Sequence, residues 1–218
     1  MTHPLAAGLR AGLEGLGLAL DEAQQQTLLS YVDWVAKWNR VYNLTAVREP
    51  QDMLTHHLLD SLAMVQPLRR YLAHAGVAQP RLLDVGAGAG LPGVVLAIAC
   101  PHLDVSCVDT VAKKALFIQQ VAAALRLPNL HGIHARVESL TQGFDVVTSR
   151  AFASLADFTT WSGAALAPGG VWMAMKGKQP ADEMAQLPAR VDVFHVEPLT
   201  VPGLDAERCI VWMRPRAT

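Results

Sequence analysis

Short apolar runs alternate with longer stretches of helical period from residue 81 onward. The runs read RLLDV, DVSCVD, LHGIHA, FDVVTS and GVWMAMK, and helical stretches such as AKKALFIQQVAAALR separate them. This alternation predicts crossover units, which build a parallel sheet with helices on both faces. The last two runs, VDVFHVEPL and ERCIVWMRP, are joined too closely for a crossover helix. We therefore expect an α/β fold with a mostly parallel sheet that one antiparallel strand finishes.

The first third of the chain has a helical pattern instead. Residues 21–42 are amphipathic with Asp21 as a plausible N-cap, and Pro50 suits the first turn of a second helix that runs through HHLLDSLAMV. Aromatic side chains fall on one stripe of the first helix, where core packing explains them better than base stacking: Tyr31, Trp34, Trp38 and Tyr42. We expect a helical N-terminal extension over residues 1–65 and a sheet domain over residues 66–218.

Composition narrows the class of protein. The chain has 218 residues, 51% of them hydrophobic, and a net charge of −1, so its core needs no disulfide or structural metal. Cys100, Cys107 and Cys209 form no CxxC pair, which argues against a zinc or redox site. The uncharged stretches 85–103 and 158–175 are broken by proline and glycine, so buried elements explain them better than membrane spans. Without a signal peptide, we expect a cytoplasmic protein that uses no metal and no membrane.

A glycine-rich stretch, LLDVGAGAGLPG at residues 82–93, points to a nucleotide-like cofactor. It satisfies GxGxxG, but a lone match of that kind is weak evidence for a nicotinamide dinucleotide. Asp84 precedes the glycines, where a carboxylate repels a pyrophosphate but suits the cationic S-adenosylmethionine. Asp109 ends the next run and can accept both ribose hydroxyls of either cofactor. The turn LAPGG before the fifth strand is typical of class I methyltransferases, so S-adenosylmethionine is favoured and a nicotinamide-dependent oxidoreductase is the alternative.

Several segments then occur in the order seen in one family: NLTAV, HHLLDSL, LLDVGAGAGLPG, VDTVAKK, ARVESL, FDVVTSRAFASL and LAPGG…MKGK. From about residue 39 to its end, the chain resembles the bacterial 16S ribosomal RNA guanine-N7 methyltransferases, small-subunit methyltransferase G. The family often has Asp-Ser at Asp109-Thr110 and Lys-Arg at Lys113-Lys114, and neither difference removes a charge. The resemblance implies a Rossmann-like class I S-adenosylmethionine-dependent methyltransferase whose partner is 16S ribosomal RNA or the precursor small ribosomal subunit.

The resemblance also implies roles for particular residues. Gly86 and Leu91 would line the methionine side of the cofactor, Val137 and Glu138 would lie beside the adenine, and Arg150 would reach the mouth of the active site. A carboxylate stabilised by a helix dipole explains Glu138 equally well. The complete set of expected cofactor-binding residues is Asp84, Gly86, Gly88, Leu91, Asp109, Val137, Glu138 and Arg150.

The residues after the fourth strand indicate which atom of the substrate accepts the methyl group. TSRAF lacks the (D/N)PP(Y/F) motif that orients an exocyclic amine. Methylation of cytosine C5 needs a cysteine nucleophile, but Cys100 lies at the far end of the first crossover helix, away from the active site. The lone pair of guanine N7 is available at neutral pH, so this chemistry requires no catalytic base, and Arg150 would only position the substrate. His57 and Asp60 share a helical face near the pocket, where a surface pair or packing contact is slightly favoured.

Basic residues follow the ends of the predicted strands, and these ends meet at one edge of a parallel sheet. We expect a basic rim that binds RNA at Lys113, Lys114, Arg136, Lys176 and Lys178, with Arg150 beside them. The rim supports a polyanionic substrate without identifying it. A non-catalytic S-adenosylmethionine-binding factor of ribosome assembly therefore remains a further alternative to the enzyme.

Overall fold

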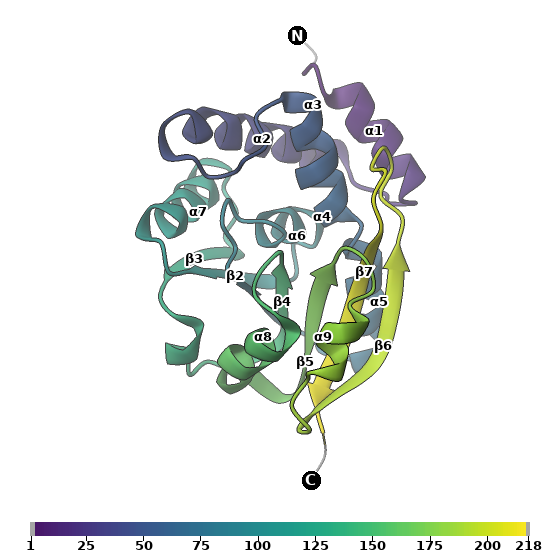
Figure 1. Cartoon of the computed structure of the whole chain (residues 1–218). Helices are drawn as coiled ribbons and strands as arrows, with labels where there is room; N and C mark the ends of the chain where they lie inside the picture. Colours follow the sequence, from purple (N-terminus) through teal and green to yellow (C-terminus); the bar gives the residue numbers. More distant parts are fainter. Residues whose placement is uncertain (1–2, 217–218) are drawn as a thin grey trace.

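A seven-stranded sheet in the order β3-β2-β1-β4-β5-β7-β6 organises the molecule (Figure 1). The computed structural model describes residues 3–216. The strands are β1 (Arg81–Val85), β2 (Asp104–Asp109), β3 (Leu130–His134), β4 (Phe144–Arg150), β5 (Leu166–Lys176), β6 (Val191–Leu199) and β7 (Arg208–Pro215). Strands β1 to β5 are parallel, and β7 is antiparallel to both β5 and β6. This confirms the mostly parallel sheet with one antiparallel strand. That strand lies inside the sheet, and β6 forms the edge.

Ten helical segments of α or π type lie before, between and after the parallel strands in residues 3–216. The first six precede the sheet: α1 (Ala6–Gly15), α2 (Glu22–Tyr42), α3 (Pro50–Met53), the π-helix η1 (Leu54–Leu59), α4 (Asp60–Leu62) and α5 (Val65–Ala75). The others are α6 (Gly93–Ala99), α7 (Ala112–Ala124), α8 (Leu155–Ser162) and α9 (Ala181–Ala185), and short 3₁₀ turns lie at η2 (Val137–Ser139) and η3 (Gly163–Ala165). The expected start of a helix at Pro50 is confirmed, but the π-helix interrupts its regular winding.

Helix α2 begins at its expected N-cap and packs against the crossover helices. Asp21 accepts a hydrogen bond from the Gln24 amide at 2.7 Å, and the Gln24 side chain accepts from the Asp21 amide at 3.0 Å, which completes a capping box. Tyr31 is fully buried and donates its hydroxyl proton to the Ala89 carbonyl at 2.7 Å. The ring of Trp38 lies 5.3 Å from that of Phe117 in α7. Core packing therefore explains Tyr31, Trp34 and Trp38, whereas Tyr42 is exposed and contradicts the prediction. Tyr31 also anchors the glycine-rich turn.

Two hydrophobic cores lie on opposite faces of the sheet, because neighbouring strand residues point to opposite sides. Leu82 and Val146 join the core under α1, α2, α5, α6 and α7, whereas Leu83 and Val147 join the core under α8. The N-terminal helices share the first core with the crossover helices. The domain boundary at residues 65/66 stays a prediction; in the structure it falls at the start of α5.

Two negative findings apply to residues 3–216. No helix there is long and apolar enough to cross a membrane. Nor do three or more histidine, cysteine or acidic side chains cluster there in a way that could hold a metal ion.

Candidate functional site

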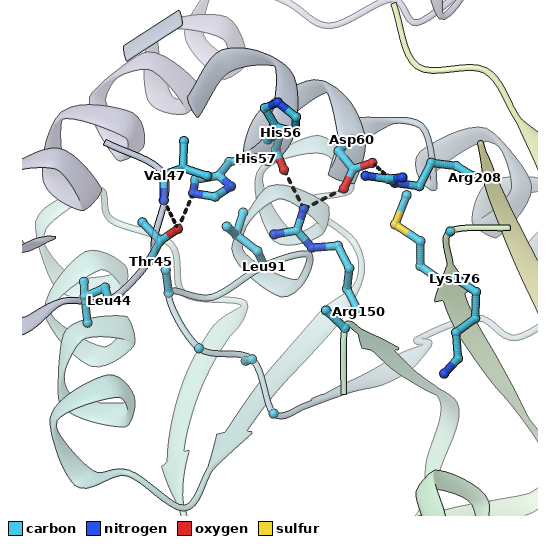
Figure 2. Close-up of a pocket in the computed structure, with 17 residues that line it drawn as sticks. Leu44, Thr45, Val47, His56, His57, Asp60, Leu91, Arg150, Lys176 and Arg208 are labelled. Carbon is cyan, nitrogen blue, oxygen red and sulfur yellow. Dashed lines mark hydrogen bonds and ion pairs between the residues drawn. The ribbon is translucent and has the colours of Figure 1, made fainter. Parts of the chain in front are cut away.

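Two cavities open where the parallel strands end, and they meet at Gly86 and Ala151. The first, which we call the loop cavity, has a volume of about 500 Å³ and is formed by segments that follow β1, β2, β3 and β4. The second, the helix cavity, has a volume of about 460 Å³ and also takes residues from the segment 44–47, η1 and α4 (Figure 2). The first cavity is thus built by the sheet and the segments that follow its strands, and the second by the sheet and the N-terminal helical region together.

The glycine-rich turn separates the two cavities. Gly86 has a φ of +68°, and a Cβ atom added to it would collide with the ring of Phe152. Gly88 has a φ of +59°, but a Cβ atom there would have no heavy atom closer than 3.9 Å. Both residues therefore need left-handed backbone, which favours glycine, and Gly86 also needs the space. Leu91 lines the helix cavity, on the side where we expect the methionine part of the cofactor.

Asp84 lies beneath this turn, out of reach of both cavities. It is fully buried, and its Oδ2 accepts a hydrogen bond from the Gly93 amide at 2.8 Å. Its Oδ1 has no hydrogen-bond partner within residues 3–216. Burial raises the pKa of this carboxyl to about 7, against the lowering effect of the Gly93 amide. The geometry therefore supports a role for Asp84 in positioning the turn, where the sequence suggested direct contact with a ligand.

Asp109 lines the loop cavity and ties two backbone segments together. Its Oδ2 accepts from the Gly88 amide at 3.0 Å and its Oδ1 accepts from the Val111 amide at 2.8 Å. The Lys114 ammonium lies 3.7 Å away. Each carboxylate oxygen can accept a second hydrogen bond, so Asp109 can hold a ligand hydroxyl while it holds the turn.

Val137 and Glu138 line the far side of the loop cavity, as expected for neighbours of an adenine. Glu138 accepts a hydrogen bond from Arg136 at 3.0 Å, and this bond lowers the pKa of its carboxyl. Sequence reasoning missed two aromatic residues of the same cavity. The rings of Phe152 and Trp161 lie 6.0 Å apart in an edge-to-face arrangement, and they offer an apolar wall for a flat ring.

A buried carboxylate joins two arginines in the helix cavity (Figure 2). Arg150, at the end of β4, donates through Nη1 to Asp60 Oδ2 and to the His56 carbonyl, both at 2.7 Å. Arg208, at the start of β7, donates through Nε to Asp60 Oδ1 at 2.8 Å. The Asp60 side chain is only 3% exposed, so both guanidinium groups are held in fixed orientations. Arg208 carries no sequence signal of its own and was not predicted.

His57 is locked beside this pair without touching Asp60. Its Nε2 lies 2.9 Å from the Thr45 hydroxyl, which also accepts a hydrogen bond from the Val47 amide at 3.2 Å. Burial and the nearby Arg150 lower the pKa of His57 to about 4, so the ring is neutral at pH 7. His57 and Asp60 are thus buried residues that line the cavity. Their burial contradicts the expected helix-surface pair and leaves the packing contact, which was the other interpretation. The π-helix η1 carries His56 and His57, and such helices often occur at functional sites.

The expected basic rim gathers around the two cavities, but much of its charge is already paired. Four of its six members lie close to carboxylates: Lys114 to Asp109, Arg136 to Glu138, Arg150 to Asp60 and Lys176 to Glu183. Lys113 and Lys178 are exposed and make no ion pair within residues 3–216. The rim is therefore less positive than a count of its lysines and arginines suggests, and its role in RNA binding stays a prediction.

Solved structures of methyltransferases share this fold. TrmN from Thermus thermophilus matches with a TM-score of 0.53 at 19% identity, covering 68% of this chain and 48% of that chain. The 16S rRNA methyltransferase RsmC from Thermus thermophilus, solved with AdoMet and guanosine, matches with a TM-score of 0.53 at 20% identity, covering 72% of this chain and 43% of that chain. At these identities, the comparison supports the class I methyltransferase fold and nothing finer.

Sequence comparison identifies the family. The ribosomal RNA small subunit methyltransferase G of Polaromonas naphthalenivorans is 66% identical over 212 residues, covering 97% of this chain and 96% of that protein. The protein of the same name from Acidovorax sp. (strain JS42) is 69% identical over 214 residues, covering 96% and 95%. The family model described as "rRNA small subunit methyltransferase G" matches residues 24–211. The resemblance seen in the sequence is confirmed, the nicotinamide alternative is not supported, and the chain belongs to the rRNA small subunit methyltransferase G family.

Proposed function

We propose that this protein transfers the methyl group of S-adenosylmethionine to N7 of a guanine in 16S ribosomal RNA, either as RNA or within the precursor small subunit. The observation that carries the proposal concerns the two groups inside the helix cavity that could act as a base: Asp60 is an ion-paired carboxylate, and His57 is a buried imidazole with a lowered pKa. The exposed His56 contributes its carbonyl to Arg150, and its ring lies on the side away from Arg150 (Figure 2). A nucleophile that must lose a proton would therefore find no effective base there. Guanine N7 loses none.

The two cavities suit the two halves of the cofactor. The loop cavity offers the carboxylates of Asp109 and Glu138 and the aromatic wall of Phe152 and Trp161, which fit an adenosine. Gly86 lies at the junction and lines both cavities, so a ligand that occupies both cavities passes along its backbone. When bound, S-adenosylmethionine supplies a methyl group activated on a sulfonium. Asp84 contributes through the Gly93 amide, because it holds the turn from below.

Partners or burial limit the use of Asp60, Lys176 and His57 as bases. Asp60 accepts from two arginines, and Lys176 donates to Glu183 at 2.7 Å. His57, with its pKa lowered to about 4, is a weak base. All three cysteines are buried, and none of them lines this cavity, which disfavours a covalent cytosine-C5 mechanism. Proximity and orientation can then supply most of the rate enhancement.

Ion pairing in the cavity limits how strongly its cations oppose methylation at N7. Methylation at N7 leaves the base with a positive charge, which an unpaired cation beside the ring would oppose. Arg150 and Arg208 both pair with Asp60, whose single negative charge offsets one of their two positive charges, and a neutral His57 adds none. Arg150 retains donors on Nε and Nη2 that can position a phosphate or the edge of the base.

The test replaces the acceptor atom. RNA with 7-deazaguanine at the target position carries carbon in place of N7, so it should bind with the affinity of the unmodified RNA and accept no methyl group. Transfer is followed with radiolabelled cofactor, and mass spectrometry of nucleosides identifies the modified atom. Methylation of the deaza RNA at the normal rate would contradict the N7 proposal. Cofactor binding without transfer to any form of the ribosomal RNA would support a non-catalytic assembly factor instead.

A further inference from the structure

A groove of about 380 Å³ lies beside the helix cavity, and the two share Gly177 and Arg208. Its walls come from the segment between β5 and α9, the end of β6 and the start of β7. The residues that matter for the argument are Lys178, Val196, Pro198, Leu199, Glu207 and Arg208. Nothing in the proposed methyl transfer itself uses this groove.

The three hollows follow one another along the edge of the sheet. The loop cavity meets the helix cavity at Gly86 and Ala151, and the helix cavity meets the groove at Gly177 and Arg208. The loop cavity and the groove share no lining residue. A ligand in the groove can therefore reach the acceptor site without displacing the cofactor, which enters from the opposite side.

Arg208 stands on the ridge between the helix cavity and the groove, and its orientation is set in advance. Its Nε donates to the buried Asp60, and its Nη1 donates to the Glu207 carbonyl at 2.9 Å. Its Nη2 makes no hydrogen bond to any residue that the structure describes. A guanidinium held in this way can bind an anion with little further loss of conformational freedom.

The rest of the groove combines one free cation with apolar walls. Lys178 is exposed, and Val196, Pro198 and Leu199 supply hydrocarbon surface beside it. Proteins bind single-stranded RNA with this combination, in which cations follow the phosphates and apolar surface covers the bases. Pro198 and Leu199 lie on an edge strand and have no hydrogen-bonding side chain, so this wall of the groove can contact any base.

We propose that the groove binds the nucleotide that flanks the target guanine in the RNA strand, with the connecting phosphate between Arg208 and Lys178. The inference rests on the proposed function, because it places the acceptor guanine in the helix cavity. It also explains why Arg208 is held so firmly outside the cofactor site. The Glu207 carboxylate lies along the same groove and opposes a phosphate there.

Two variants test the proposal, one that removes a positive charge from the groove and one that removes a negative charge. Both are measured on the form of the RNA that the wild-type protein methylates. These measurements are made with S-adenosylhomocysteine bound. Lys178→Ala should weaken RNA binding and make the slope of log K against log salt concentration shallower by about 0.7, as for one lost contact to single-stranded RNA. Glu207→Gln should tighten binding by about two- to fivefold, the range for an exposed charge pair. Arg190→Ala is the matched control, because Arg190 is exposed next to the other end of β6. Cofactor affinity should stay constant in all three.

A cleavage reagent tethered to the protein then places the RNA. Lys178→Cys carrying an iron chelate should cut the RNA backbone within a few nucleotides of the methylated guanine, and Arg190→Cys should not. Unchanged salt dependence in Lys178→Ala, or no cleavage near the target, would overturn the proposal, and a contact to a ribosomal protein in place of RNA would do the same. Failure of the proposed function would show itself differently, as wild-type protein that puts no methyl group on N7.

Discussion

The loop cavity and the helix cavity differ in how far along the chain their parts lie from one another. The loop cavity is formed within residues 85–161, from the ends of parallel strands and from the turns and helices that follow them. The helix cavity joins Thr45, between α2 and α3, and Asp60 of α4 to Arg150 from β4 and Arg208 from β7. Asp60 and Arg208 are 148 residues apart in the chain. Local backbone geometry makes the first cavity, whereas packing between distant elements makes the second.

This difference has a consequence for stability and function. A side chain lost from the loop cavity removes a ligand contact and leaves the strands around it in place. A side chain lost from the centre of the helix cavity separates elements that only tertiary contacts hold together. We therefore expect mutations in the loop cavity to act mainly on the cofactor, and mutations in the helix cavity to act on folding and on RNA together.

Asp60→Ala should have the largest effect of the variants that distinguish the two cavities. It leaves Arg150 and Arg208 without their shared partner, and removing one member of a buried ion pair costs about 3–5 kcal/mol. We expect the free energy of unfolding in urea to fall by about this amount, together with a loss of methyl transfer.

Asp192→Ala is the matched control for Asp60. Asp192 pairs with Arg214 at 3.0 Å near the exposed edge of the sheet, with side chains that are 32% and 57% exposed. Its loss should cost less than about 1 kcal/mol. If both variants lost the same free energy of unfolding, the buried ion pairs of Asp60 would stabilise the protein no more than an exposed ion pair does.

The boundary between the cavities is tested by a pair of glycines. Gly86→Ala and Gly88→Ala both force alanine into left-handed backbone, at a cost of about 1–2 kcal/mol. Only Gly86→Ala also pushes against the Phe152 ring, so it should lose more stability and more cofactor affinity than Gly88→Ala. Urea unfolding and calorimetric titration with S-adenosylmethionine measure both. Indistinguishable variants would show that Phe152 does not restrict the junction.

Asp109→Ala addresses the loop cavity by itself. We expect cofactor binding to weaken by about 1.5–3 kcal/mol, the range for hydrogen bonds to a charged group. RNA affinity should change little, because Asp109 lies outside the helix cavity. Asp104→Ala, at the exposed start of the same strand, should change neither. An unchanged cofactor dissociation constant in Asp109→Ala would refute the assignment of its carboxylate.

The smallest effect appears in the pH dependence of stability, to which His57 of the helix cavity and Asp84 beneath the glycine-rich turn contribute. His57 has a folded pKa of about 4, below its usual 6.5, so the stability it contributes is present above pH 6.5 and is lost as the pH falls through 4. Asp84 has a folded pKa of about 7, above its usual 3.8, so its contribution is present below pH 3.8 and is lost as the pH rises through 7. Between about pH 5 and 6.5, His57 makes the free energy of unfolding rise with pH and Asp84 makes it fall, so the two contributions cancel.

Single variants should expose these slopes. His57→Gln should make unfolding stability fall with pH in this window by up to about 1.4 kcal/mol per unit, and Asp84→Asn should make it rise by a similar amount. Urea titrations at several pH values give the slopes. If both variants kept the wild-type slope, the burial of these two groups would not govern their ionisation.

Much of the fold follows from local pattern. The bounds of β1, β2 and β6 agree with the runs read from the sequence. Strands β1 and β2 are buried on both faces, so each is a short and mostly apolar run. Asp21 begins α2 as expected, because its side chain satisfies a backbone amide that the helix leaves free. The position of β7 inside the sheet could not be predicted in this way. Which strands lie beside a given strand depends on how the rest of the sheet is arranged, and the sequence of the strand itself does not specify this.

The candidate site divides along the same line. The sequence by itself predicted the glycine-rich turn and the carboxylate of Asp109 at one edge of the sheet, because the carboxyl ends of parallel strands meet there. Val137 and Glu138 were implied by the family resemblance, and the structure places them in the loop cavity beside Asp109. Only the tertiary structure decided that Asp84 is buried beneath the turn and that Arg208 joins Arg150 on Asp60. Burial and ion pairing between distant segments depend on how whole elements pack, and neither hydrophobic period nor motif spacing encodes that arrangement.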